Sequence, residues 1–178
     1  MVAVAEEKAG PDPDQAWKVL TLVNDWIKHA DSKVGATVAV TAATAVGLYK
    51  VLDSVEKPGW VVMTMSFACA VFLLLAAGQA LMALTPRVHL HKKRPERYDN
   101  LLFYRHIARG YRTTQRSQYL LSLAELTVDR HELTRQIAAQ VYANAAVADR
   151  KYGWSNKAIV SLAVAITFLA LAAFAAWK

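Results

Sequence analysis

The chain has 178 residues and a formal net charge of +7, and 55% of its residues are hydrophobic. Residues 85–156 hold 13 Lys or Arg against 6 Asp or Glu, whereas three other long stretches hold no charge. This division argues against an ordinary soluble domain and indicates a small membrane protein with a charged part in water. The single cysteine excludes an intrachain disulfide and a zinc site built from cysteines.

The N-terminal segment is predicted to be an acidic tail followed by a helix. Residues 1–14 are rich in Pro, Gly and acidic side chains, which favours a mobile tail, and we expect no secretory signal peptide here. We expect Asp14 to cap a helix over residues 15–33, where residues of one kind recur at spacings of three and four. The apolar stripe is Trp17, Leu20, Val23 and Ile27, and the polar stripe is Asn24, Lys28 and Asp31.

This helix runs without a stop signal into the first charge-free stretch, Val34 to Tyr49. Its 16 residues are few for a full span, but Lys33 and Lys50 can extend their side chains to the headgroups. We therefore predict a transmembrane helix over 34–52, with burial against other subunits as the alternative. Three threonines on it can bond the backbone or a neighbouring helix. They are Thr37, Thr41 and Thr44.

The second charge-free stretch, Trp60 to Leu84, has 25 residues. A bilayer is spanned by about 20 apolar residues in a helix, so this stretch predicts a transmembrane helix. Pro58-Gly59 mark a turn before it, and Thr85-Pro86 terminate it. With the short connector 53–59, residues 34–84 are predicted to form a membrane hairpin.

The third charge-free stretch, Ala158 to Trp177, predicts a transmembrane helix over 157–178. Residues 85–97 carry five Lys or Arg beside a membrane end, whereas the connector 53–59 carries one. By the positive-inside rule, 1–33 and 85–156 face the cytoplasm, and the connector and the C-terminus face outward. The expected location is the cell membrane, with several passes.

Residues 85–156 are predicted to start with a basic loop and to continue as helices. Ser117 to Leu126 is expected to be a short helix, and Asp129 with Glu132 has the spacing of a capping pair. The amphipathic helix that they open is expected to reach about Tyr152, with Gly153 loosening the junction to the last span. Its apolar face is Leu133, Ile137, Val141, Ala145 and Ala148, and its polar face is Arg135, Gln136, Gln140, Asn144 and Asp149.

The predicted fold is an all-α membrane protein with three transmembrane helices and a small helical cytoplasmic domain inserted between the second and third. Because the core of that domain would be thin, we expect it to form a homo-oligomer or to pack against the N-terminal helix. The sequence holds no Walker loop, no GxSxG and no pair of carboxylates at useful spacing, so we expect neither an enzyme nor a cofactor. His89 and His91 lack further ligands nearby, and we expect no metal site.

The basic, aromatic-containing stretch suits a nucleotide ligand. Arg and Lys bind phosphate, Tyr and Phe stack on a base, and Asn and Gln read its edges. Duplex nucleic acid is disfavoured, because no DNA-binding motif is present. The alternative for Lys92, Lys93 and Arg94 is contact with anionic lipid. The candidate ligand contacts are Arg87, Arg105, Arg109 and Lys151 for the anion, with Tyr104 and Asn144.

Asp31 and Lys33 are candidates for signalling, because they immediately precede the first charge-free stretch. The alternative is a structural role, as a salt bridge at the membrane border with a lysine that reaches toward the headgroups. Asn144 and Lys151 have the same two interpretations.

Two stretches carry a resemblance to a known family. The first is Asn24 to Ala36, NDWIKHADSKVGA, and the second is Gln140 to Tyr152, with ADRKY at its end. Together with Pro86-Arg87 they resemble the transmembrane effectors of Pycsar, the pyrimidine cyclase system for antiphage resistance. The resemblance extends over residues 16–177. It implies a partner cyclase that makes cyclic CMP or cyclic UMP, an effector that senses it, and membrane impairment that causes abortive infection.

Two other functions compete with this one. A related membrane effector could respond to another nucleotide signal, such as an oligonucleotide. A non-signalling structural protein could use the same basic stretch only to lie on anionic lipid.

Overall fold

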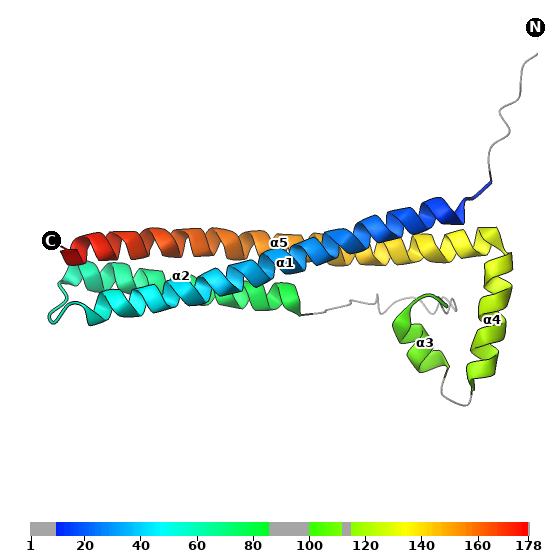
Figure 1. The fold of residues 1–178 in the computed structure, drawn as a ribbon, viewed down its shortest axis with the longest axis horizontal. Coiled ribbons are helices and arrows are strands. Elements are labelled where there is room, and N and C mark those ends of the chain that lie inside the picture. The colour runs from blue at the N-terminus through cyan, green and yellow to red at the C-terminus, as the bar shows by residue number, and fades with distance from the viewer. Residues whose placement is uncertain (1–9, 86–99, 112–114, 178) are drawn as a thin grey trace, which may run out of the picture. The chain divides into compact units, whose positions relative to one another are not determined.

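A computed structural model describes residues 10–85, 100–111 and 115–177 (Figure 1). All regular structure in these ranges is helical, as predicted. The helices are α1 (Pro13–Asp53), α2 (Trp60–Leu84), α3 (Tyr104–Gly110), α4 (Arg116–Val128) and α5 (Arg130–Trp177). Three of them, α1, α2 and α5, are long and apolar enough to cross a membrane.

The chain divides into two compact units. The first comprises residues up to 25 and 89–146, and the second comprises 26–88 and 147–178. This division differs from the predicted insert over 85–156, because the start of α1 groups with α3 and α4 while residues 147–156 group with the apolar helices. The alternative expectation, packing of this region against the N-terminal helix, agrees with the first unit.

Helix α1 begins two residues earlier than predicted, and its cap is Asp12 rather than Asp14. The carboxylate of Asp12 accepts a hydrogen bond from the backbone N–H of Asp14 at 3.0 Å. Pro13 occupies the first helical position, where its missing N–H costs nothing and its fixed φ suits the helix. Asp14 therefore lies inside the first turn, where a negative charge is favourable.

Helix α5 runs for 48 residues without a break, so the predicted loosening at Gly153 is wrong. A glycine inside a helix costs only about 1 kcal/mol relative to alanine. Packed apolar residues on both sides, Ala148 and Ala158, offset that cost because both are buried. Helix α1 is likewise continuous from residue 13 to residue 53, and α2 has the predicted bounds.

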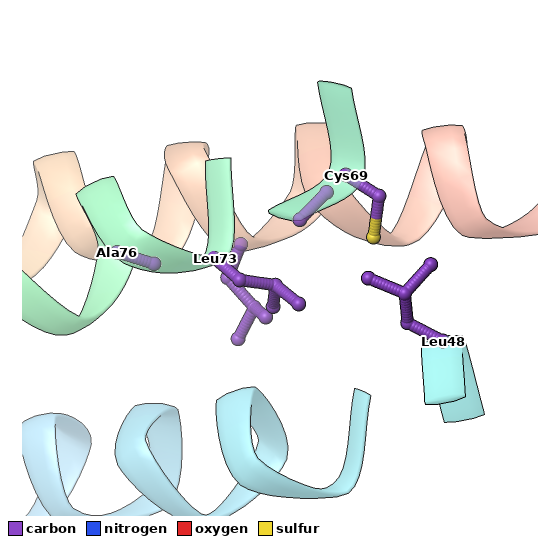
Figure 2. Packing of buried hydrophobic residues seen from close by; sticks show 6 residues of the cluster. Leu48, Cys69, Leu73 and Ala76 are labelled. Atoms are coloured by element: carbon purple, nitrogen blue, oxygen red, sulfur yellow. The ribbon is translucent and has the colours of Figure 1, made fainter. Parts of the chain in front are cut away.

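The helices of the second unit pack through a repeated spacing of three and four residues. In α2, every buried residue follows this spacing: Val62, Ser66, Cys69, Leu73, Ala76, Ala80 and Ala83. This is the heptad geometry of helices that interlock side chains along a shared seam. Helix α5 lies parallel to α1, and α2 lies antiparallel to both (Figure 1). One buried cluster draws on all three helices: Leu48, Cys69, Leu73, Ala76, Leu162 and Ala165 (Figure 2).

The outward face of α2 is as apolar as its buried face. Phe67, Leu74 and Leu81, each seven residues apart, are 72%, 75% and 66% exposed. A helix that is apolar on every side suits a lipid environment, because water would solvate such a face poorly.

In the first unit, α4 confirms the short helix predicted over 117–126. Asp129 caps α5, because its carboxylate accepts the backbone N–H groups of His131 and Glu132 at 3.0 Å each. The side chain of Glu132 accepts hydrogen bonds from Arg135 and Gln136. In the described contacts, therefore, only Asp129 of the predicted capping pair caps the helix.

Candidate functional site

In the second unit, α1 and α5 are joined by an ion pair next to the apolar helix segments. The ammonium of Lys151 donates to a carboxylate oxygen of Asp31. Lys151 is only 16% exposed, whereas Asp31 is 41% exposed. Two residues further along α1, the ammonium nitrogen of Lys33 lies over the ring of Tyr152, 5.2 Å from the ring centroid. A cation over an aromatic face is attracted by the ring's electrons, so this contact adds to the pairing of the two helices.

A second polar contact joins the same two helices in the first unit. The side-chain amide of Asn144 donates to the side-chain oxygen of Asn24 at 2.8 Å, with the amide orientation assigned from the bonding. Both contacts join residues 120 positions apart, and they lie seven residues apart on each helix. Seven residues make two turns of a helix with a heptad repeat, so Asn24 and Asp31 lie on one side of α1, and Asn144 and Lys151 lie on one side of α5.

The sequence pattern assigns Asn144 to the polar face of α5, but the structure places it against α1. The predicted apolar face used Ala145, but Asn144 is half-buried and in contact with α1. Strict alternation of three and four from the fully buried Ile137 leads to 141, 144 and 148, and this pattern in the sequence could have identified Asn144. Ile137 and Ala148 are buried as predicted.

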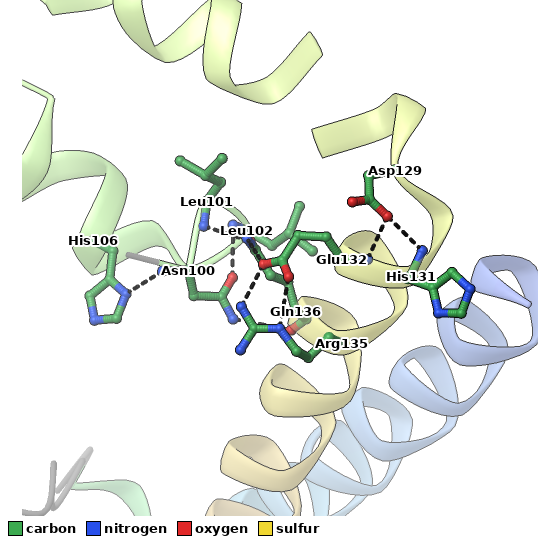
Figure 3. Close-up of polar contacts among 9 residues, drawn as sticks. All are labelled: Asn100, Leu101, Leu102, His106, Asp129, His131, Glu132, Arg135 and Gln136. Carbon is green, nitrogen blue, oxygen red and sulfur yellow. Dashed lines mark hydrogen bonds and ion pairs between the residues drawn. The ribbon is translucent and has the colours of Figure 1, made fainter. Parts of the chain in front are cut away.

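In the first unit, hydrogen bonds tie the segment before α3 to α5 (Figure 3). The side-chain amide of Asn100 donates to the backbone oxygen of Gln136 at 3.1 Å, and the N–H of Leu101 donates to the Gln136 side chain at 2.9 Å. The N–H of Asn100 donates to Nδ1 of His106 at 3.1 Å, and Tyr119 of α4 donates to the Leu101 oxygen at 3.3 Å. Gln136, which the sequence pattern assigns to the polar face of the helix, therefore helps to position α3.

Helix α3 carries three of the candidate ligand contacts. Tyr104 is 67% exposed, and its ring lies 4.9 Å from that of Phe103 between centroids. Arg109 is exposed in the last turn of α3, where positive charge is favourable. Arg105 belongs to the same helix. Arg87, His89, His91 and the run 92–94 lie outside the described residues.

The structure brings the remaining candidates together in pairs. Asn144 contacts Asn24, and Lys151 contacts Asp31, so each has a partner on α1. Lys33 contacts Tyr152, which ends the ADRKY stretch but is not among the candidate site residues.

A shallow hollow of about 390 Å³ lies at the N-terminal ends of α1 and α5. Arg130 and Asp12 face each other across it at 3.9 Å. Asp12 and Asp129 already accept the N–H groups at the two helix starts, so an added anion would meet two carboxylates there. The lining residues are Gly10, Pro11, Asp12, Arg130 and His131, and none is a sequence-based candidate.

Gln136→Ala is expected to release the segment before α3. The half-buried N–H of Leu101 loses its acceptor, and an unsatisfied N–H costs about 1–3 kcal/mol. Hydrogen exchange measured by mass spectrometry should therefore speed up over residues 100–103. Gln140→Ala, one turn along α5, is the matched control and should leave exchange there unchanged. Equal exchange in both variants would contradict a positioning role for Gln136.

Glu132 gives the first unit a small dependence on pH. Hydrogen bonds from Arg135 and then Gln136 lower the pKa of this carboxyl below its ordinary value. A lowered pKa in the folded state means stability that is present above the unfolded pKa, about 4.3, and lost as pH falls through the folded value. Because the side chains of Arg135 and Glu132 are 49% and 34% exposed, solvent screens the pair, and we expect at most a few tenths of a kcal/mol. Titration by carbon-detected NMR should show the lowered pKa, and Arg135→Ala should raise it.

Comparisons with known proteins were made over the whole chain. The profile of the Pycsar effector protein domain matches residues 15–177. The Pycsar effector protein PtPycTM of Propioniciclava tarda is 35% identical over 159 residues, which are 89% of this chain and 77% of that protein. No solved structure matches.

Proposed function

Because this chain belongs to the Pycsar effector family, we propose that it senses cyclic CMP or cyclic UMP and then impairs the cell membrane. In this proposal it is an antiphage effector, not an enzyme, and a pyrimidine nucleotide cyclase supplies its messenger. Impairing the membrane stops the infected cell before phage matures. The match over residues 15–177 carries the proposal, because it covers the charged and the apolar segments together.

We propose that α1, α2 and the apolar part of α5 cross the membrane. Residues 1–33 and 85–156 then face the cytoplasm, and the connector 53–59 faces outward. The charge bias supports this orientation, because five Lys or Arg fall within 85–97 and one within the connector. Lys157 over the Trp154 ring at 4.6 Å suits an anchor at the membrane border.

The cytoplasmic residues are proposed to bind the messenger. A cyclic mononucleotide has one negative charge and a planar base, which match an arginine and an aromatic ring. Exposed Tyr104 and Arg109 on α3 have this chemistry, and Arg87 and Arg105 are proposed to join them. Gln136 of α5 bonds Asn100 and Leu101 just before α3, and Asn100 bonds His106 of α3. A ligand that moves α3 would therefore also act on α5.

Helices α1 and α5 are proposed to carry the signal. Each runs without a break from charged residues into an apolar segment. Moving a population from 1:99 to 99:1 needs about 5.5 kcal/mol of differential affinity, which several sites in a homo-oligomer would supply together. Exposed apolar residues outside the three apolar helices support such an oligomer of identical chains. On α4 they are Leu120, Leu121 and Val128.

The test uses the full chain in liposomes of phosphatidylethanolamine and phosphatidylglycerol loaded with potassium. Cyclic CMP or cyclic UMP should bind by calorimetry and start potassium efflux, and cyclic AMP should do neither. Tyr104→Ala with Arg109→Ala should weaken binding, whereas Lys50→Ala, on the other side of the membrane, should not. Absence of binding to both pyrimidine messengers would overturn the proposal.

The same assay separates the two alternatives. Efflux started by an oligonucleotide, without response to cyclic mononucleotides, would indicate a different messenger. Tight association with anionic liposomes without any nucleotide response would indicate a structural, lipid-associated protein.

A further inference from the structure

Hydroxyl groups gather on the inner faces of the three apolar helices in the second unit. Six Ser and Thr side chains there are each less than a tenth exposed. We call them the hydroxyl seam: Thr37, Thr41 and Thr44 of α1, Ser66 of α2, and Ser155 and Ser161 of α5. The two positions in these helix segments that instead expose a threonine are Thr64 and Thr167.

Hydrogen bonding does not require the threonines to be buried. Thr41 and Thr44 each donate to the backbone oxygen four residues earlier at 2.7 Å. Thr64 and Thr167 make the same bond while exposed, at 2.8 and 3.0 Å. A threonine that bonds its own helix can therefore face outward, and a valine would fill the inner position with a more apolar side chain.

Two serines in the seam have no hydrogen-bond partner among the described residues. They are Ser66 and Ser155, which are 4% and 0% exposed. Ser161 differs, because it bonds Gln79 of α2 at 2.9 Å and so joins two helices. A buried hydroxyl without a partner destabilises the packed state, and alanine would avoid that loss. Such groups are rare in packed proteins, and a second state in which water satisfies them would account for their presence here.

A belt of larger apolar side chains interrupts the hydroxyl seam. Leu48, Leu73 and Leu162 meet there from three helices, and the thiol of Cys69 lies beside Leu48 (Figure 2). Phe72 of α2 stacks on Phe168 of α5 beside them, with ring centroids 5.7 Å apart. Packed side chains of this size leave no passage for water in the described arrangement.

We infer that the hydroxyl seam becomes the wall of a water-filled path for small ions when the three helices separate. The inference rests on the proposed function and specifies the surface that damages the membrane. Water would satisfy Ser66 and Ser155 in the open state, so their hydroxyls favour opening. The seam carries no charged residue, so the path should pass small ions of either sign.

The single cysteine offers a native probe of this path. Cys69 is fully buried within the apolar belt. In proteoliposomes it should be inert toward a charged, membrane-impermeant methanethiosulfonate at rest, and it should react at least tenfold faster after cyclic CMP or cyclic UMP. Thr41→Cys in a Cys69→Ala chain should behave in the same way. The matched control is Phe67→Cys in that chain, which is exposed toward lipid and should stay inert in both states.

The outcomes separate this inference from the function on which it rests. Potassium efflux with unreactive Cys69 and Thr41→Cys would overturn the path through the seam and leave the effector function standing. Absence of efflux with both messengers would overturn both. Reaction of Phe67→Cys alone would place the leak at the lipid-facing surface and overturn the inference.

A second variant tests the two serines. Ser66→Ala with Ser155→Ala should lower efflux about tenfold at a fixed messenger concentration, since removing two unsatisfied hydroxyls favours the packed state. Messenger binding should weaken by no more than the same factor, because binding and opening are linked. Thr64→Val and Thr167→Val, on the outer faces, are the control pair. Equal efflux from the serine pair and the wild type would contradict the role of the hydroxyls.

Discussion

Asp31→Asn is expected to destabilise the second unit by about 1–3 kcal/mol, more than the removal of its partner does. It leaves the ammonium of Lys151, which is only 16% exposed, without its carboxylate. Lys151→Met leaves instead the carboxylate of Asp31, which is 41% exposed and hydrated, so that variant should cost about 0–1 kcal/mol. The difference arises because an unpaired charge is more costly where water reaches it less.

Thermal unfolding in detergent micelles measures both variants, and a chain with both Asp31→Asn and Lys151→Met completes a double-mutant cycle. The reversed pair, Asp31→Lys with Lys151→Asp, should recover part of the lost stability. Asp53→Asn, exposed at the end of α1, is the control. Equal losses for Asp31→Asn and Lys151→Met would contradict the argument that the less exposed charge is the more costly one to leave unpaired.

The second large effect is expected from one extra alanine after Val147. One residue rotates the following part of a helix by about 100°, since a turn takes 3.6 residues. Lys151 and the fully buried Ser155 and Ala158 would leave the face that packs on α1 and α2. The chain should still insert, because its apolar segments are intact, but its response to the messenger should be lost.

A rescue makes this prediction specific for helix phase. Seven residues inserted in both helices, after Ile27 in α1 and after Val147 in α5, keep Asp31 opposite Lys151 and preserve the heptad phase. This double insertion should respond to the messenger, whereas seven residues in α5 alone should not. Potassium efflux from proteoliposomes is the measurement, and a wild-type response from the one-residue variant would refute transmission through α5.

The sequence predicts the helical segments well where the signal is local or strong. The bounds of α2 follow from an uncharged stretch of 25 residues between a Pro-Gly turn and a Thr-Pro stop. The cap of α5 at Asp129 follows from a short polar pattern that needs no distant partner. At the start of α1, Pro13 suits the first helical position, so the sequence itself favours Asp12 over Asp14 as the cap, and the prediction did not use this signal.

Contacts between segments far apart in the chain could not be predicted in this way. Gln136, Asn144 and Lys151 are polar residues of a helix that is polar on much of its surface, so periodicity alone does not show which of them face another helix. Their partners, Leu101, Asn24 and Asp31, lie 35, 120 and 120 positions away.

By itself, the sequence determined that this protein is helical and has three segments able to cross a membrane, because apolar length and missing charge are properties of each segment alone. Only the tertiary structure decided which polar groups pair between α1 and α5 and which hydroxyls are buried among the apolar helices. The physical reason is that a side chain's environment depends on the phase of the helix packed against it, and that phase is set jointly by both helices.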